Sequence, residues 1–266
     1  MSGAGVHRHI LKNRRAASPA VSMVIITAAT VVMVLVSGSY AFQVLERQQA
    51  AREFETVQKS ILAFDDAVRD IAWDRGGSRS VRFTTNYGIM RLMSSSKSFQ
   101  ITTSQFSYTF TTGVVKYDMP SSYFTLGNGY SSYILGDEST VVSSLADSFG
   151  QALVKQEAGF ASIALNYRVR VSQEGPSTLV GSTPINYVDI LVIRLNCTDL
   201  SLGSGDFDLV AKNVGLNTTS YGPYPVGNAG TISVASDGVP TKSIQLDLEN
   251  GQVMFNLIIA DVRVST

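Results

Sequence analysis

Histidine and cysteine are scarce in this chain of 266 residues. Both histidines, His7 and His9, lie within the first ten residues. The remainder therefore has no residue for a Ser-His-Asp or Cys-His catalytic site, or for a histidine-ligated metal site. The one cysteine, Cys197, excludes an internal disulfide and a cysteine-clustered metal site. These absences favour a non-enzymatic protein that holds no cofactor or metal.

Charge is absent from residues 16–45, "AASPAVSMVIITAATVVMVLVSGSYAFQVL", which we call the apolar segment. As a helix these thirty residues would span about 45 Å, against about 30 Å for the hydrocarbon core of a bilayer. Every charge before the segment is basic, which predicts a cytoplasmic leader over 1–16 and an extracellular body. Beyond the segment, 17 basic residues face 21 acidic ones, so the body has no electrostatic reason to bind nucleic acid.

Three interpretations of the apolar segment compete. A secreted protein would be cut after Ser39-Tyr40-Ala41, but the segment is longer than the usual core of a signal peptide. A plain single-span anchor would keep the whole segment as a transmembrane helix over 17–45. The third interpretation comes from the junction between the basic leader and the apolar segment.

That junction, "RRAASPAVSMVIITAATVV", resembles the class III signal of archaeal type IV pilins and pilin-like proteins. The resemblance covers about thirty residues: a short basic leader, a small residue, a Ser-Pro pair and a long apolar helix. It implies a prepilin peptidase that cuts on the cytoplasmic face, an apolar helix that stays in the mature chain, and assembly with sister subunits into a surface filament. Val21 stands where bacterial pilins often carry a glutamate, which is a departure from their pattern.

Carried over residue by residue, the resemblance implies roles for five positions. Arg15 would be the charged residue before the cleavage site, and Ala16 the last residue removed. Ala17 would become the new N-terminus, followed by Ser18 and Pro19. Proline suits the first turn of a helix, where its missing N–H needs no partner.

Glycine and proline are absent from residues 46–73, "ERQQAAREFETVQKSILAFDDAVRDIAW". Apolar residues recur there in alternating steps of four and three, which predicts an amphipathic stalk helix over 46–75 that Gly76-Gly77 terminates. This stripe would pack on the body that follows, or would form a dimeric coiled coil. We call it the packing stripe: Ala50, Phe54, Val57, Ile61, Phe64, Val68 and Ile71.

After residue 77 the apolar period changes to two, which predicts a mostly antiparallel β head over 78–266. The cleanest alternation runs from Ile163 to Val171, residues 187–195 suit a central strand, and Asn250-Gly251 suits a tight hairpin turn. One short helix is expected over 143–155, and a division of the head into two parts near 174–176. The predicted class is α+β, a long N-terminal helix followed by a pilin-like or β-sandwich-like head.

Acidic residues are the remaining candidates for metal or catalytic chemistry, although basic neighbours and loop positions favour ordinary surface roles. The groups are Asp65, Asp66, Asp70 and Asp74 in the stalk, the adjacent pair Asp137-Glu138, and Asp206 with Asp208. Two triplets, beginning at Asn217 and Asn196, fit the N-glycosylation pattern. The tyrosine-rich stretch 117–136 would serve adhesion to an unknown extracellular ligand or would fill the core.

Overall fold

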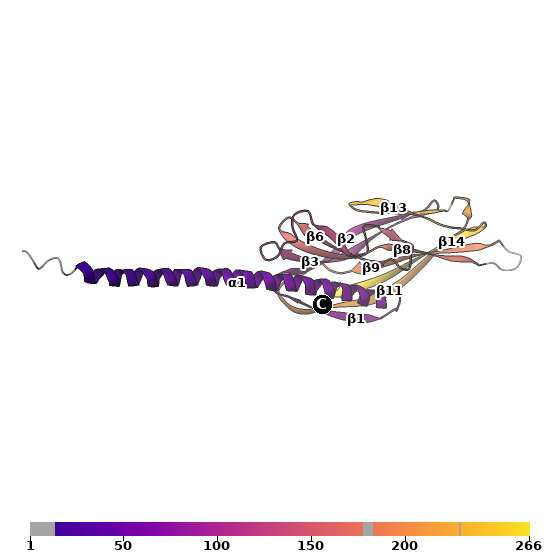
Figure 1. The fold of residues 1–266 in the computed structure, drawn as a ribbon. Helices are drawn as coiled ribbons and strands as arrows, with labels where there is room; N and C mark the ends of the chain where they lie inside the picture. The colour runs from indigo at the N-terminus through magenta and orange to yellow at the C-terminus, as the bar shows by residue number, and fades with distance from the viewer. Residues whose placement is uncertain (1–13, 178–182, 229) are drawn as a thin grey trace, which may run out of the picture. The chain divides into compact units, whose positions relative to one another are not determined.

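The computed structural model of the chain describes residues 14–177, 183–228 and 230–266, and the side chains of residues 21–175, 183–227 and 230–266. Its contacts divide the chain into two compact units, Met1–Gln49 and Ala50–Thr266. Most of the predicted leader lies outside the described residues. The expected α+β class is confirmed, because one long helix precedes a strand-rich body (Figure 1).

Helix α1 (Arg14–Ile71) passes without a break from the apolar segment into the packing stripe. It ends four residues before the expected position, although the Ala72 N–H still donates to the Val68 carbonyl at 2.9 Å. Gly76 follows with φ of 86°, a left-handed conformation that glycine adopts without steric cost. The helix therefore ends close to the point where the sequence changes from helix-forming residues to glycine.

The strands of the second unit form two sheets. One sheet has the order β1 (Ser78–Thr85), β11 (Gly205–Pro225), β14 (Gln252–Ser265), β9 (Ile185–Asn196), β8 (Val169–Ser177) and β5 (Val141–Val142). The other has the order β13 (Val239–Gln245), β12 (Thr231–Ser236), β2 (Ile89–Thr102), β3 (Ser107–Pro120), β7 (Phe160–Tyr167), β6 (Gly150–Glu157) and β4 (Ser131–Leu135), with β10 (Leu200–Leu202) beside β2. Among the described strands the pairings are antiparallel, except β14 with β9 and β5 with β8. A short 3₁₀ turn, η1 (Val226–Asn228), follows β11.

The second unit has two apolar cores that are built differently. The first contains the packing stripe of α1 together with side chains from both sheets, such as Phe83 and Leu165. The second contains side chains of the two sheets without the helix, such as Phe99 and Phe255. Helix and sheets share one core, and the sheets alone share the other.

Strands β9 and β14 contribute to both cores by changing the face that they bury. In β9 the buried residues up to Val192 belong to the second core, and those from Ile193 belong to the first. In β14 the same change falls between Ile259 and Ala260, which are the register partners of Val192 and Ile193. Successive residues of a strand point to opposite faces, so β9 and β14 change the face that they bury at the same pair of register partners.

Two expected strand arrangements are wrong. The alternation from Ile163 to Val171 belongs to two strands, because the chain leaves β7 and enters β8 of the other sheet at Arg168. Asn250-Gly251 does form a bend, but β13 pairs with β12 while β14 pairs with β11 and β9, so no hairpin joins the two arms. β14 is buried on both faces from Ile259 to Val262, which suits a central strand better than a hairpin arm.

Two further expectations also differ from the structure. The short helix expected over 143–155 is wrong, because residues 150–157 form strand β6 between β7 and β4. Residues 174–176, where a division of the head was considered, lie inside β8. The chain instead divides between Gln49 and Ala50, within α1.

Candidate functional site

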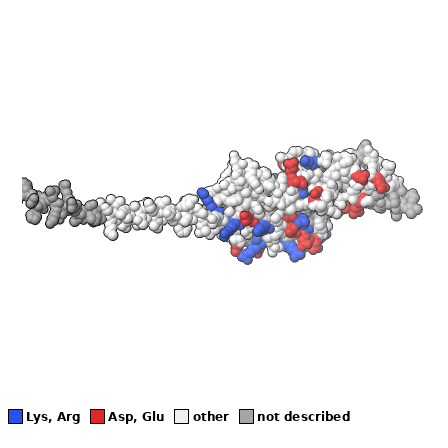
Figure 2. Space-filling view, in the orientation of Figure 1, with Lys and Arg blue, Asp and Glu red and all other residues white. Residues whose placement is uncertain are grey.

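The apolar segment is the largest exposed apolar surface among the described residues. Its large side chains from Val21 to Leu45 are between 36% and 72% exposed, and none of its most apolar window is buried. Figure 2 shows its described part without Lys, Arg, Asp or Glu, whereas both charge signs occur together on the second unit. The helix that contains it is long and apolar enough to cross a membrane.

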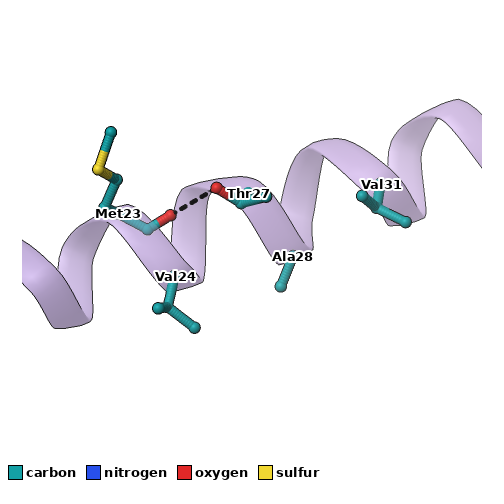
Figure 3. Close-up of a pocket in the computed structure, with 5 residues that line it drawn as sticks. All are labelled: Met23, Val24, Thr27, Ala28 and Val31. Atoms are coloured by element: carbon teal, nitrogen blue, oxygen red, sulfur yellow. Dashed lines mark hydrogen bonds between the residues drawn. The ribbon is translucent and has the colours of Figure 1, made fainter.

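Three hydroxyl groups of the apolar segment are satisfied within the helix itself. Thr27, Thr30 and Ser39 each donate a hydrogen bond to the carbonyl four residues earlier, at 2.8 to 3.0 Å. Figure 3 shows the bond from Thr27 to Met23, and beside it the small side chain of Ala28. These bonds let the polar side chains enter an apolar environment without an unpaired donor.

The small side chain of Ala28 leaves a shallow hollow on this helix, lined by Met23, Val24, Thr27, Ala28 and Val31 (Figure 3). The hollow is almost entirely apolar, and it lies on a helix surface that no described residue covers. A complementary apolar side chain or lipid chain fits such a surface, whereas a polar ligand finds no partner there.

The five residues with implied roles in leader processing lie in the first turns of α1, and their side chains are outside the described set. The helix begins at Arg14, so it runs across the bond between Ala16 and Ala17. Pro19 is the sixth residue of this helix, and it would be the third residue of a chain that begins at Ala17. Nothing in the geometry tests the cleavage.

The packing stripe is buried throughout: each of its seven side chains is at most 3% exposed. Phe54 contacts the rings of Tyr117 and Phe124, and Phe64 contacts the ring of Phe83. The stripe thus fills the first core of its own unit, and its side chains are not available for a coiled-coil dimer.

Glu53, next to the stripe, holds α1 against the turn between β1 and β2. Its buried carboxylate accepts hydrogen bonds from the backbone N–H groups of Asn86, Tyr87 and Gly88 at 2.8 to 3.3 Å, and from the Tyr117 hydroxyl at 2.6 Å. Gly88 is required there, because a Cβ would lie 2.3 Å from the Tyr117 ring. Burial, followed by the negative charge of Glu53, raises the pKa of Tyr117, so this phenol stays a donor.

Asn213 of β11 caps the C-terminal end of α1. Its side-chain amide donates to the carbonyls of Ile71 and Ala72, at 3.1 and 2.6 Å. Its backbone also exchanges hydrogen bonds with Gly76 and Gly77. A helix end that is buried needs such donors, since its last carbonyls have no partner within the helix. No local pattern in the sequence indicates the roles of Glu53 and Asn213, because their partners lie far along the chain.

Five of the eight acidic candidates form salt bridges with basic side chains. Arg69 pairs with Asp65, at 2.8 Å, and with Asp66. The other pairs are Asp70 with Arg79, Asp206 with Arg82, and Asp137 with Arg168. Within the described ranges, no three His, Cys, Asp or Glu residues are grouped so that they could hold a metal ion.

Both candidate glycosylation sites are exposed to solvent. Asn217 lies within strand β11, and its side-chain amide donates to the Asp261 carboxylate at 3.4 Å. Asn196 ends strand β9, and Cys197 beside it is buried against Gly113.

The tyrosine-rich stretch 117–136 has both core and surface members. Tyr117 is fully buried, whereas Tyr123 and Tyr130 are 38% and 42% exposed. The ring of Tyr123 contacts that of Tyr87 edge to face, 5.2 Å between centroids. Core packing therefore applies to Tyr117, whereas adhesion by the exposed tyrosines stays a prediction.

Comparison of this chain with family models, with curated proteins and with solved structures gives no match.

Proposed function

We propose that this chain is a non-enzymatic, membrane-anchored subunit of an archaeal type IV pilus-like surface filament. Before assembly, residues 17–45 would anchor it as a single-pass helix with the N-terminus in the cytoplasm and the head outside the cell. After removal of the leader by a prepilin peptidase, the same residues would pack against sister helices. The head would then mediate surface interaction or adhesion.

The exposed apolar segment is the observation that carries this proposal. Twenty-five residues, 21–45, include large side chains that are up to 72% exposed in the described structure. Apolar surface of this extent is stable only when lipid or other protein covers it. The membrane would cover the apolar segment before assembly, and a bundle of identical helices would cover it afterwards.

The junction between leader and apolar segment supports a filament subunit over a plain anchor. A plain anchor needs only length and hydrophobicity, and would not require the small residue and Ser-Pro pair after Arg15. The continuity of α1 from the apolar segment into the packing stripe fits the same proposal, since one helix then connects the anchoring residues with the core of the head.

The alternative is a single-span protein that keeps its leader, never assembles, and uses its head to bind an extracellular ligand or partner. A pocket in the second unit, described below, favours ligand binding by the head. Filament assembly and ligand binding are compatible, so the two proposals differ in the fate of the N-terminus.

The N-terminal residue of the mature protein tests the proposal. We expect mass spectrometry of the chain extracted from membranes of an archaeal host to find a start at Ala17. An intact leader would support the plain anchor, and a start at Phe42 would mean secretion. The matched variant is Ala16→Leu with Ala20→Leu as control: a bulky residue at the cleavage site should stop processing, whereas the same change four residues later should not.

Surface localisation separates a subunit from a processed protein that stays in the membrane. Filaments sheared from cells should contain the chain, and cells expressing Ala16→Leu should lose it from the sheared fraction while retaining it in the membrane. Recovery of the uncleaved variant in filaments would contradict the role of processing in assembly.

A further inference from the structure

A pocket of about 310 Å³ lies beside the C-terminal end of α1, within the second unit. Its walls are Trp73, Phe149, Leu191 and Ile193, and two guanidinium groups, those of Arg69 and Arg170, border it. Trp73 is the single tryptophan of the chain and is 41% exposed. Its ring meets that of Phe149 at 88°, with 6.1 Å between centroids. The two rings thus form a corner whose solvent-exposed wall is Trp73, since Phe149 is only 4% exposed.

The two arginines that border the pocket differ in their charge balance. Arg69 is neutralised by Asp65 and Asp66, which lie on the same helix. Arg170 stacks over the Phe149 ring at 5.1 Å and donates to the Asp147 carbonyl at 2.5 Å, but it forms no salt bridge with any described carboxylate. Its Nε is buried without a hydrogen-bond partner. Arg170 therefore brings one positive charge that the pocket does not balance.

The surroundings of Arg170 reinforce this imbalance. Burial, followed by the positive charges of Arg168 and Arg69, lowers the pKa of Arg170, which remains charged in any ordinary solution because arginine titrates so high. Positive charge beside an apolar wall attracts an anion strongly, because low-dielectric surroundings screen the interaction less than water does. The negative charge of Asp147 acts on Arg170 in the opposite direction, but more weakly than these positive charges.

We propose that this pocket binds a ring of about monosaccharide size that bears one carboxylate, such as a hexuronate. The carboxylate pairs with the Arg170 guanidinium, whose planar fork matches its two oxygens. One face of the ring lies in the corner between Trp73 and Phe149. A volume near 310 Å³ is at the lower end of ligand pockets, which are roughly 300 to 1,000 Å³, and suits one ring rather than an extended chain.

The position of Trp73 allows a direct test with the full chain in detergent micelles. D-glucuronate should change the tryptophan fluorescence saturably, because the only tryptophan of the chain lines the pocket. Glucose, which lacks the carboxylate, and acetate, which lacks the ring, should produce no saturable change at the same concentrations. Benzoate, an aromatic ring with one carboxylate, shows which class of acid the pocket binds. If only benzoate binds, the site belongs to aromatic acids; if glucuronate binds, the site belongs to acidic sugars.

Substitutions of Arg170 test the proposed contact. Arg170→Gln should weaken glucuronate binding by about tenfold or more, since a hydrogen bond to a charged group is lost. Arg170→Lys, which keeps the charge without the fork, should fall between that variant and the original chain. Arg82→Gln, a change at an exposed arginine of β1 that does not border the pocket, should leave the affinity within about twofold. Circular dichroism before titration shows whether each variant is folded.

Three results would overturn the proposal: no saturable response to glucuronate or benzoate, equal responses to glucose or acetate, or equal affinities of the original chain, Arg170→Gln and Arg170→Lys. The pocket lies wholly within the second unit and is assayed on dispersed chains. Its test therefore stands apart from the proposed filament, whose failure appears as an uncut N-terminus.

Discussion

Before Gln49, α1 exposes apolar side chains on all sides, whereas from Ala50 onward it exposes polar side chains and buries one apolar stripe. Both halves have the same secondary structure and neither contains a proline or a break after Pro19. The difference lies in where the partner of each apolar surface is found. The second half has its partner in the strands of the same chain, while the described residues offer none to the first half.

The comparison shows that one helix can be held by two different means. In water, helical stability comes mostly from packing of an amphipathic face, which is how the second half is held. In lipid, the helix is favoured because each backbone donor and acceptor is satisfied within it, and the hydroxyls of Thr27, Thr30 and Ser39 follow the same rule. Substitutions of one residue type in the two halves should therefore have very different effects.

A buried and an exposed phenylalanine of α1 give the largest expected contrast. Phe64→Ala should reduce the free energy of unfolding of the second unit by about 3 to 5 kcal/mol, because it leaves a cavity in the first core. Phe42→Ala, at a side chain that is 70% exposed, should leave it unchanged. Denaturant unfolding in micelles, followed by Trp73 fluorescence, measures both. If Phe64→Ala and Phe42→Ala changed the free energy of unfolding equally, the stability of the second unit would not depend on the packing stripe.

A charge introduced into the first half should act on membrane insertion. Leu35→Arg places a guanidinium near the middle of the apolar segment and should disfavour insertion by about 2.5 to 3.5 kcal/mol. Leu45→Arg, beside Glu46, should cost much less, since a long basic side chain at the end of a span reaches the aqueous interface. The fraction of each variant that resists carbonate extraction measures the difference. If both variants insert equally, the segment does not span the bilayer.

The Glu53 carboxylate tests whether the second half is held by polar contacts as well as by packing. Glu53→Ala should reduce the free energy of unfolding by about 1.5 to 3 kcal/mol, because the backbone N–H groups of the β1–β2 turn and the Tyr117 hydroxyl lose a charged acceptor. Glu53→Gln, which keeps one carbonyl acceptor, should lose less. Glu55→Ala, two residues along the same helix and exposed, is the matched control.

The helix and its stripe were predictable because their signals are local. Absence of charge over residues 16–45 and a period of 3.5 over residues 50–71 each follow from neighbours along the chain. The end of the helix was placed within four residues, since Gly76-Gly77 interrupts the run of helix formers. Cleavage of the leader and assembly stay predictions, because they depend on other proteins.

The pairing of strands was not predictable, because it depends on contacts far along the chain. Alternation from Ile163 to Val171 correctly indicates extended backbone, but it does not show that the chain changes sheets at Arg168. The same holds for the pocket: Arg69 and Arg170 are about a hundred residues apart, and only the crossing of β8 beside the end of α1 brings them together. Sheet topology is fixed by the fit of whole faces, which local propensity does not encode.

The smallest expected effect concerns acid, which should act on the second unit and not on the apolar segment. Glu157 lies between Lys116 and Lys155, at 2.7 and 3.0 Å. Burial of Glu157 opposes its ionisation, but the two lysines together outweigh it and hold its pKa below the ordinary 4.5. Because the pKa of Glu157 is lower in the folded chain than in the unfolded chain, its carboxylate stabilises the fold at pH values above the unfolded-state pKa. This stabilisation is lost as the pH falls through the folded-state pKa.

Glu157→Gln should therefore lower the free energy of unfolding by about 0.5 to 1 kcal/mol at neutral pH, and by progressively less below about pH 4.5. Glu55→Gln, at an exposed residue with no salt bridge in the described structure, should show no such pH dependence. Residues 16–45 contain no carboxyl, histidine or basic group, so the helical circular dichroism of the micelle-bound segment should persist at the acid end of the titration. A segment that unfolds together with the second unit would show that the first half of α1 is held by the head and not by the apolar phase around it.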